Sequence, residues 1–363
     1  MDTNRIIQYN VLNTPWPLAD NSIDCCVTSP PYWGLRDYGV AGQLGLEKTP
    51  EEYVQKMVFV FEEVKRVLKP CGTLWLNLGD SYAASGRGGG GGSINEHDIG
   101  KKITGDNNRR KPVIGLKPKD LVGIPWMVAF ALRSAGWYLR SDIIWAKKNC
   151  MPESVTDRPT RSHEYIFLLS KSTKYYYDQE AIKEPAIYDV DGTGTAARKA
   201  RQKEENKSMP TIINGGIRPA GFKDAEKMNG KHGGKGNRKT FRGGGKYTKN
   251  QSFDNSQIVE NDSHGNAPSL TGMRNKRDVW NVAPAQFPEA HFATFPEELI
   301  TPCILAGCPK DGIVLDPFIG AGTTALVSLS HGRQFIGFEL NPAYITIANK
   351  RLKQKFGMFY NEK

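Results

Sequence analysis

The chain has 363 residues, which fits one large domain with an insertion or two modest domains and excludes a single small module. Hydrophobic residues make up 39% of the chain and aromatic residues 10%, so wholesale disorder is excluded as well. The 49 Lys and Arg residues outnumber the 38 Asp and Glu residues and give a net charge of +11, while no apolar run reaches the roughly 18 residues of a membrane span.

The first strong signals are a strand and a helix. Residues 22–27 are apolar and partly β-branched and lead into the turn-forming residues 28–31, which predicts a strand that ends in a loop. Thr49 and Glu52 form a capping box, Pro50 suits the first helical position, and apolar residues follow at helical spacing up to Leu68. A helix is therefore expected to follow the loop.

Further elements alternate along the first 180 residues. Residues 69–72 predict a turn, and residues 73–78 predict a buried strand. A helix is expected over residues 125–135, with strands at 137–145 and 164–169. This alternation of helices and strands favours a parallel sheet.

Two segments differ from this regular pattern. Residues 86–92 are almost entirely glycine, and we expect a mobile loop over residues 86–115. Residues 192–280 contain 18 Lys and Arg residues against 8 Asp and Glu residues and few apolar ones, so nearly all of the excess positive charge lies there. This stretch predicts either a segment that binds a polyanion or a solvated basic loop.

The regular pattern resumes near the C-terminus. The apolar spacing there predicts helices from Pro296, over residues 323–329 and from Pro342, and strands at residues 313–315 and 335–338. The two ordered parts of the chain therefore flank the basic stretch.

Residues 312–324 have the order of a cofactor loop. A predicted strand ends in Asp316, a turn with Gly320 and Gly322 follows, and a helix begins. Glu339 ends the next predicted strand, where a carboxylate accepts hydrogen bonds from ribose hydroxyls in nucleotide sites. The glycine spacing suits neither a pyrophosphate nor a triphosphate, so a nucleoside cofactor without phosphates fits better. The alternative is an ordinary tight turn, which the order of strand, acid, glycines, helix, strand and second acid makes the weaker interpretation.

The loop after residues 22–27 suits chemistry on an exocyclic amine. The lone pair of such an amine is delocalised into the base, and hydrogen-bond acceptors on its two N–H groups localise it toward a methyl donor. The Ser29 hydroxyl and the Pro30 carbonyl are such acceptors, and the two prolines fix the backbone. Tyr32 can stack on an extruded base. The alternative is a rigid turn whose aromatic residues pack on the core.

Together, residues 28–33 and 316–324 resemble the β subgroup of the S-adenosylmethionine-dependent DNA amino-methyltransferases, with a serine-type tetrapeptide and a D-P-F-x-G-x-G-T-T loop. Residues 291–297 are similar to the family segment that precedes this loop and lines the methionine end of the cofactor. The resemblance covers roughly residues 1–180 and 286–363, and the basic stretch matches the family's recognition region by position and charge.

The resemblance implies roles for individual residues. No metal ligand is expected, because the six cysteines form no CxxC pair and have no histidine partners at zinc spacing. The target amine would be held by Ser29, Pro30, Pro31 and Tyr32. Asn10 stands near the position where relatives carry an acid close to the adenine. The residues implied in S-adenosylmethionine binding are Asn10, His291, Ala293, Thr294, Phe295, Asp316, Pro317, Phe318, Gly320, Gly322, Thr323 and Glu339.

The resemblance also implies an α/β fold: a circularly permuted Rossmann-like methyltransferase with a mostly parallel seven-stranded sheet and helices on both faces. The catalytic half would span residues 1–180, a basic target-recognition region residues 181–285, and the cofactor-binding half residues 286–363.

The function that follows is site-specific DNA methylation at the exocyclic amine of a flipped base. The serine-type tetrapeptide favours cytosine N4, with adenine N6 as the alternative. Methylation of cytosine carbon 5 needs a thiolate, and Cys71 lies in a predicted turn away from the tetrapeptide. Other hypotheses are an RNA or protein glutamine substrate, or a non-catalytic nucleic-acid-binding protein on the same scaffold.

The implied partner is double-stranded DNA, and the family context allows a cognate restriction endonuclease. The oligomeric state stays open. We expect a cytoplasmic protein of a bacterium, archaeon or phage, because the start of the chain lacks the pattern of a signal peptide.

Overall fold

The structure is a computed structural model that describes residues 2–83, 115–150, 152–185, 273–284, 294–357 and 360, together with the backbone of residues 211–213 and 216–218. The contacts divide the chain into two compact units. The first consists of Met1–Ile182 and Asn275–Lys363, and the second of Lys183–Arg274. No helix in the described ranges is long and apolar enough to cross a membrane.

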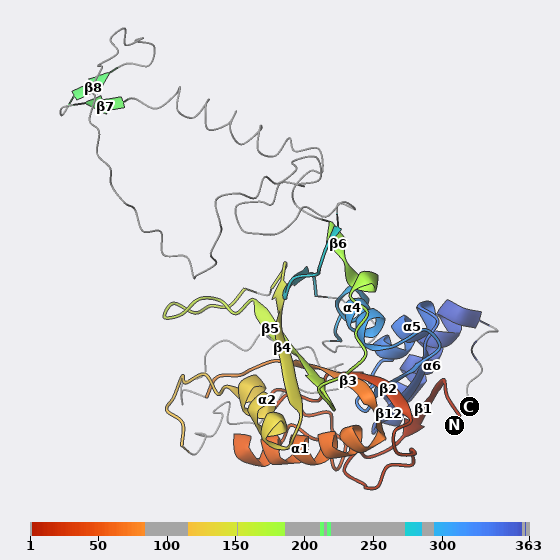
Figure 1. Cartoon of the computed structure of the whole chain (residues 1–363). Coiled ribbons are helices and arrows are strands. Elements are labelled where there is room, and N and C mark those ends of the chain that lie inside the picture. The colour runs from red at the N-terminus through yellow and green to blue at the C-terminus, as the bar shows by residue number, and fades with distance from the viewer. Residues whose placement is uncertain are drawn as a thin grey trace, which may run out of the picture. The chain divides into compact units, whose positions relative to one another are not determined.

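The first unit is built on an eight-stranded sheet, shown in Figure 1. Its strand order is β1-β12-β11-β2-β3-β5-β4-β10. The strands are β1 (Arg5–Gln8), β2 (Ile23–Thr28), β3 (Leu68–Leu78), β4 (Tyr138–Lys147), β5 (His163–Ser170), β10 (Val279–Val282), β11 (Ile313–Asp316) and β12 (Gln334–Glu339).

Helices cover both faces of this sheet. They are α1 (Pro50–Val67), α2 (Ile124–Ser134), α4 (Glu297–Gly307), α5 (Thr323–Ser330) and α6 (Pro342–Phe356), with a short 3-10 helix η1 (Glu180–Ile182). On β2, Cys26 packs in one core cluster with α1 and α2, while Cys25 and Val27 pack in a second cluster with α4. Because successive side chains of a strand point to opposite faces, α1 and α2 lie on one face and α4 on the other.

Local sequence signals explain α1. Thr49 accepts a hydrogen bond from the Glu52 backbone N–H at 3.2 Å, and Pro50 occupies the first turn. The apolar stripe places Tyr53, Met57 and Phe61 in the core with no exposed surface. A capped helix with one apolar face forms here because its N–H groups and its apolar side chains both find partners.

The strand order places two loops beside each other. Strands β1, β12, β11, β2 and β3 run parallel, and β2 lies next to β11. From β2 the chain passes through α1 to β3, whereas from β11 it passes through α5 to β12 on the other side. In open α/β sheets, ligands bind outside the carboxyl ends of the strands where the order reverses in this way.

The predicted fold class is confirmed, with two differences in detail. The sheet has eight strands rather than seven, because the four-residue β10 adds to β4 in parallel. Residues 69–72, predicted as a turn, belong to β3: Leu68 pairs with Ile23 and Thr73 with Cys25, so the pairing register shifts across the intervening residues. The turn-forming residues Pro70 and Gly72 are therefore accommodated within β3, and the pairing of β3 with β2 continues after them.

The second unit lies within the predicted recognition region 181–285. Its described elements are two antiparallel pairs, β6 (Glu184–Pro185) with β9 (Met273–Arg274) and β7 (Thr211–Ile213) with β8 (Gly216–Arg218). Residues 275–284 belong instead to the first unit. The glycine-rich loop predicted over residues 86–115 and most of the basic stretch lie outside the described residues, apart from Gly115 in the loop.

Candidate active site

The tetrapeptide loop and the glycine-rich loop meet at the switch point of the sheet. Leu315 of β11 pairs with Cys26 of β2, so both strands end at the same edge. At that edge the Thr28 hydroxyl donates a hydrogen bond of 2.6 Å to Oδ1 of Asp316, and both groups are buried. Thr28 immediately precedes Ser29, so the structure brings the predicted target-amine site next to the predicted cofactor loop.

Asp316 joins three elements of this edge. Its Oδ1 also accepts the Phe318 backbone N–H at 3.0 Å, and its Oδ2 accepts the Thr324 hydroxyl of α5 at 2.6 Å. Burial raises the pKa of Asp316 to about 6, although these three hydrogen bonds oppose the shift. The carboxyl group therefore links β2, β11 and α5 through hydrogen bonds.

The hydrogen bond between Thr28 and Asp316 can be tested through the stability of the protein. We expect Thr28→Val to lower the free energy of unfolding by about 1–3 kcal/mol at neutral pH, because a buried carboxylate loses a donor. The Thr28 hydrogen bond favours the ionised form of Asp316, whose pKa is about 6. The loss should therefore be smaller below about pH 5, where the carboxyl is protonated.

Denaturant unfolding at both pH values measures this difference. Thr346→Val is a matched control, because Thr346 lies exposed on α6 and its hydroxyl donates a hydrogen bond to the Pro342 carbonyl of the same helix at 3.1 Å. We expect this control to change the free energy of unfolding by less than about 0.5 kcal/mol. If Thr28→Val lowers the free energy of unfolding by the same amount at both pH values, the hydrogen bond to the ionised Asp316 does not have the proposed role.

The glycine-rich turn has the shape of a cofactor cradle. Gly320 and Gly322 have φ values of +50° and +81°, which favour glycine. A Cβ on Gly322 would lie 2.9 Å from Cβ of Ala348, so this glycine allows α6 to pack closely. A Cβ on Gly320 would meet nothing nearer than the Phe318 carbonyl at 3.9 Å. The backbone at Gly320 therefore borders open space.

Glu339 lies beside this cradle. Its Oε2 accepts the Gly320 N–H at 3.0 Å, and its Oε1 accepts the Asn341 N–H at 2.8 Å. Burial raises the pKa of Glu339, and these backbone donors oppose the shift. A carboxylate offers about four lone-pair positions, so each oxygen has capacity for a further donor. The remaining acceptor positions of this carboxylate fit the two ribose hydroxyls of a nucleoside, which would donate to it.

The other predicted cofactor residues lie in three described places, and two more lie outside the described residues. Asn10 follows β1, which pairs with β12, and its Oδ1 accepts the Leu12 N–H at 3.0 Å. Thr294 and Phe295 are half-buried just before α4, and Phe295 packs against the core cluster on that face. Pro317 and Thr323 are buried and Phe318 is half-buried in or beside the turn, whereas His291 and Ala293 lie outside the described residues.

The tetrapeptide is held from outside by α1 and the segment before it. The Tyr53 hydroxyl donates a hydrogen bond of 2.9 Å to the Pro31 carbonyl. The indole N–H of Trp33 donates to the Glu47 carbonyl at 3.0 Å. A Cβ on Gly45 would lie 2.9 Å from the Tyr32 carbonyl, so only glycine allows this close approach. These contacts fix the loop backbone.

Tyr32 makes a polar network that the sequence analysis missed. Its hydroxyl lies 2.7 Å from Oε2 of Glu164, 3.0 Å from Oδ1 of Asn77 and 3.3 Å from the Ser29 hydroxyl. Burial, followed by the Glu164 carboxylate, raises the pKa of Tyr32 well above its ordinary value. A Cβ on Gly79 would lie 2.5 Å from Cε2 of Tyr32, so the ring packs directly on this glycine.

The antiparallel pairing of β3 and β5 creates this network. Asn77 pairs with Ile166, and its side chain donates to the Tyr165 carbonyl at 3.0 Å and to Glu164 at 3.3 Å. The signals available in the sequence were an amide inside the apolar strand 73–78 and an acid at the start of the apolar strand 164–169. Neither signal indicates by itself which residue it faces.

Basic residues near this edge have partners within the protein. Lys147 forms an ion pair with Glu164, and Arg161 donates to the Asp80 carbonyl. Arg158 pairs with Glu153 and lies 4.0 Å above the Tyr82 ring. These contacts give structural roles to all three basic residues.

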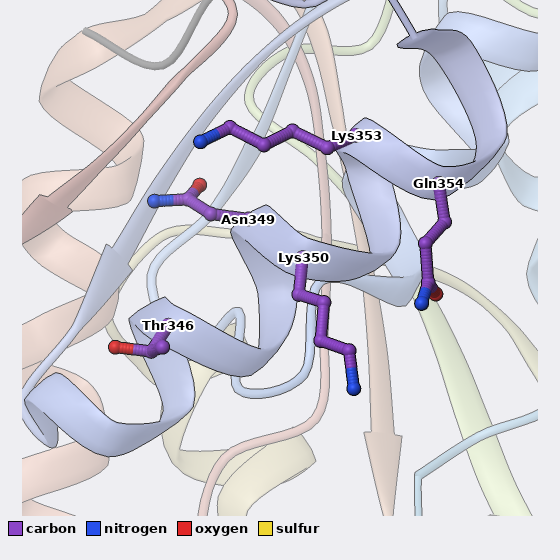
Figure 2. Close-up of a pocket in the computed structure, with 5 residues that line it drawn as sticks. All are labelled: Thr346, Asn349, Lys350, Lys353 and Gln354. Atoms are coloured by element: carbon purple, nitrogen blue, oxygen red, sulfur yellow. The ribbon is translucent and has the colours of Figure 1, made fainter.

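The surface of α6 carries a separate depression of about 550 Å³. Figure 2 shows its lining residues, Thr346, Asn349, Lys350, Lys353 and Gln354, which all come from this one helix. The lining includes none of the residues in the loops after β2 and β11. The depression is therefore distinct from the candidate active site.

Comparison with known proteins agrees with this geometry. The family N6_N4_Mtase, described as DNA methylase, matches residues 23–350. The type II methyltransferase M.XycI of Xanthomonas campestris pv. cyanopsidis is 41% identical over 336 residues, which cover 93% of this chain and 83% of that protein. M.SmaI of Serratia marcescens is 41% identical over 338 residues, with coverage of 93% and 87%.

A solved structure shows the same fold. The cytosine-N4-specific PvuII DNA methyltransferase aligns with a TM-score of 0.54 at 15% identity, covering 96% of this chain and 86% of that chain. The sequence matches confirm the resemblance stated from the two loops. The chain belongs to the N6_N4_Mtase family of DNA methylases.

Proposed function

We propose that this DNA amino-methyltransferase methylates N4 of cytosine in double-stranded DNA, with S-adenosylmethionine as the methyl donor. The observation that carries the proposal is the hydrogen bond between Thr28 and Asp316. It joins the residue before Ser29 to the strand that leads into the glycine-rich turn. A methyl acceptor held at one loop then faces a donor held at the other.

The cofactor side of the site is assigned to the turn after β11 and to the ends of β12 and β1. When bound, S-adenosylmethionine supplies an electrophilic methyl group on a sulfonium. The Glu339 carboxylate accepts hydrogen bonds from the ribose hydroxyls, and the Asn10 amide lies on the same edge for contact with the adenine. The open backbone at Gly320 gives the ligand room to approach.

The acceptor side of the site is assigned to the tetrapeptide. The Ser29 hydroxyl and the Pro30 carbonyl accept hydrogen bonds from the two N–H groups of the target amine and localise its lone pair. The Tyr32 ring stacks on the extruded base, and stacking of this kind contributes about 1–3 kcal/mol per base. Catalysis then depends on positioning and on dispersal of charge in the transition state.

Serine at the first position of the tetrapeptide is the feature that favours cytosine N4 over adenine N6. DNA contact is assigned to the basic region 181–285, which would fix the position of the protein on the duplex and read its sequence. In the same proposal, the protein is cytoplasmic, and its family context allows a cognate restriction endonuclease.

The methylated base can be identified directly. We expect duplex DNA treated with the protein and labelled S-adenosylmethionine to yield N4-methylcytosine when it is digested to nucleosides and analysed by mass spectrometry. The Ser29→Ala variant is the control and should incorporate far less label. Detection of N6-methyladenine would show that adenine, not cytosine, is the target base. DNA binding without any incorporated label would overturn the proposed activity and favour a non-catalytic DNA-binding protein with this fold.

A further inference from the structure

We propose that Glu164 is the final acceptor of the proton that the target amine loses, and that this proton passes through Ser29 and Tyr32. This inference rests on the proposed function, because it concerns the amine held at Ser29. It assigns a positioning and proton-accepting role to a residue from β5, which follows the tetrapeptide by more than a hundred positions.

The three groups form a continuous hydrogen-bonded chain. The Ser29 hydroxyl donates to the Tyr32 hydroxyl at 3.3 Å, and the Tyr32 hydroxyl donates to Oε2 of Glu164 at 2.7 Å. Each hydroxyl oxygen keeps acceptor capacity for the group before it. The chain begins at the atom assigned to the target amine and ends at a carboxylate.

The transfer balances atom by atom. Once the amine nitrogen has gained its methyl group it carries a positive charge, and its N–H bond breaks with the electron pair staying on nitrogen. That proton moves to Oγ of Ser29, the hydroxyl proton of Ser29 moves to the oxygen of Tyr32, and the phenol proton moves to Oε2 of Glu164. The nitrogen, Ser29 and Tyr32 end neutral, and Glu164 ends as a carboxylic acid.

The surroundings explain why Glu164, rather than Tyr32, holds the proton. Tyr32 is buried beside a carboxylate, which makes its phenolate unfavourable, so its hydroxyl transmits a proton without remaining ionised. Oε1 of Glu164 forms an ion pair with Lys147, and the Asn77 amide lies 3.3 Å from Oε2, so the carboxyl group is fixed in place beside the Tyr32 hydroxyl. The Tyr32 phenol lies between the Ser29 hydroxyl and the Glu164 carboxylate, which suits it to transfer a proton from one to the other.

The location of Glu164 also gives the proton a route to water. The Glu164 side chain is 14% exposed and that of Lys147 is 23% exposed. Among the described contacts, the charged or titratable groups that face Glu164 are Lys147 from β4 and Tyr32 from the loop after β2, while Asn77 from β3 is uncharged. The carboxyl can therefore return its proton to solvent between turnovers.

Glu164→Gln tests the relay with little change of shape. The amide oxygen still accepts the Tyr32 hydrogen bond but cannot take its proton. We expect the single-turnover rate of methyl transfer to fall by about tenfold or more, in the range of general acid–base effects. The fall in rate on the acid side of the wild-type pH profile should disappear, and the dissociation constants for S-adenosylmethionine and DNA should stay within about twofold.

A double-mutant cycle with Tyr32→Phe separates a relay from independent effects. Phenylalanine keeps the stacking ring and removes the hydroxyl. If both residues belong to one relay, the double variant should be no slower than the slower single variant, because either change already interrupts the chain. Glu153→Gln is the matched control, since Glu153 is an acid paired with Arg158 between β4 and β5, and its rate should equal that of the wild type.

Three results would overturn the inference. They are a wild-type rate and pH profile for Glu164→Gln, multiplicative losses in the double variant, or a lowered cofactor affinity and melting temperature in Glu164→Gln that account for its lower rate. Tyr32→Phe keeps the test decisive if Glu164→Gln folds poorly, because an unchanged rate in that variant also excludes the relay. Failure of the proposed function is a different result, since the wild-type protein would then transfer no methyl group.

Discussion

Tyr32→Ala is expected to slow methyl transfer about 100-fold while the affinity for S-adenosylmethionine stays unchanged. Loss of the ring removes a stacking contribution of about 1–3 kcal/mol, and each 1.4 kcal/mol corresponds to a factor of ten. It also removes the group that joins Ser29 to Glu164 and Asn77. Single-turnover kinetics measure the rate, and calorimetric titration measures cofactor binding.

Tyr32→Phe is the matched control for this prediction. It retains the ring on Gly79 and removes only the hydroxyl, so its rate should lie between those of the wild type and Tyr32→Ala. Equal losses of rate and cofactor affinity in Tyr32→Ala would contradict the division of the site into an acceptor loop and a cofactor loop. Equal rates for the two variants would assign the whole effect to the hydroxyl.

The second large effect is expected at the cofactor end of the site. Glu339→Ala should weaken the binding of S-adenosylmethionine about 100-fold or more, while DNA affinity without cofactor stays within about twofold. Hydrogen bonds to a charged group contribute about 1.5–3 kcal/mol each, and the proposal assigns two of them to this carboxylate. The variant also loses the contact that holds the Gly320 N–H.

Glu339→Gln keeps the size of the side chain and one acceptor oxygen, and its loss of cofactor affinity should be smaller than that of Glu339→Ala. Glu298→Ala is a second control, because Glu298 is an exposed acid on α4. Isothermal titration with S-adenosylmethionine measures all three variants. Wild-type affinity in Glu339→Ala would exclude the carboxylate from the ribose site.

Much of the fold was predicted from sequence signals between residues that are close together in the chain. The capping box at Thr49 and Glu52 predicted the start of α1, and the structure shows that hydrogen bond at 3.2 Å. The turn with Gly320 and Gly322 predicted the junction of β11 and α5, where both glycines have positive φ. These features depend on residues within a few positions of each other, so chain order alone contains them.

Strand order decided what the sequence could not. Residues 69–72 are predicted as a turn because the preference of Pro70 and Gly72 for turns is local, whereas pairing on both sides of the segment, at Leu68 and Thr73, includes it in β3. Strand β10 adds an eighth strand because β4 offers it an edge, and an edge is a property of the assembled sheet.

The candidate site divides in the same way. The sequence predicted which loops would carry the chemistry, since Ser29, Tyr32 and the glycine turn stand in motifs of adjacent residues. The hydrogen bonds from Thr28 to Asp316 and from Tyr32 to Glu164 became evident from the three-dimensional fold alone. Each of these contacts joins residues more than a hundred positions apart, and such contacts form only after parallel and antiparallel pairing has brought the strand ends together.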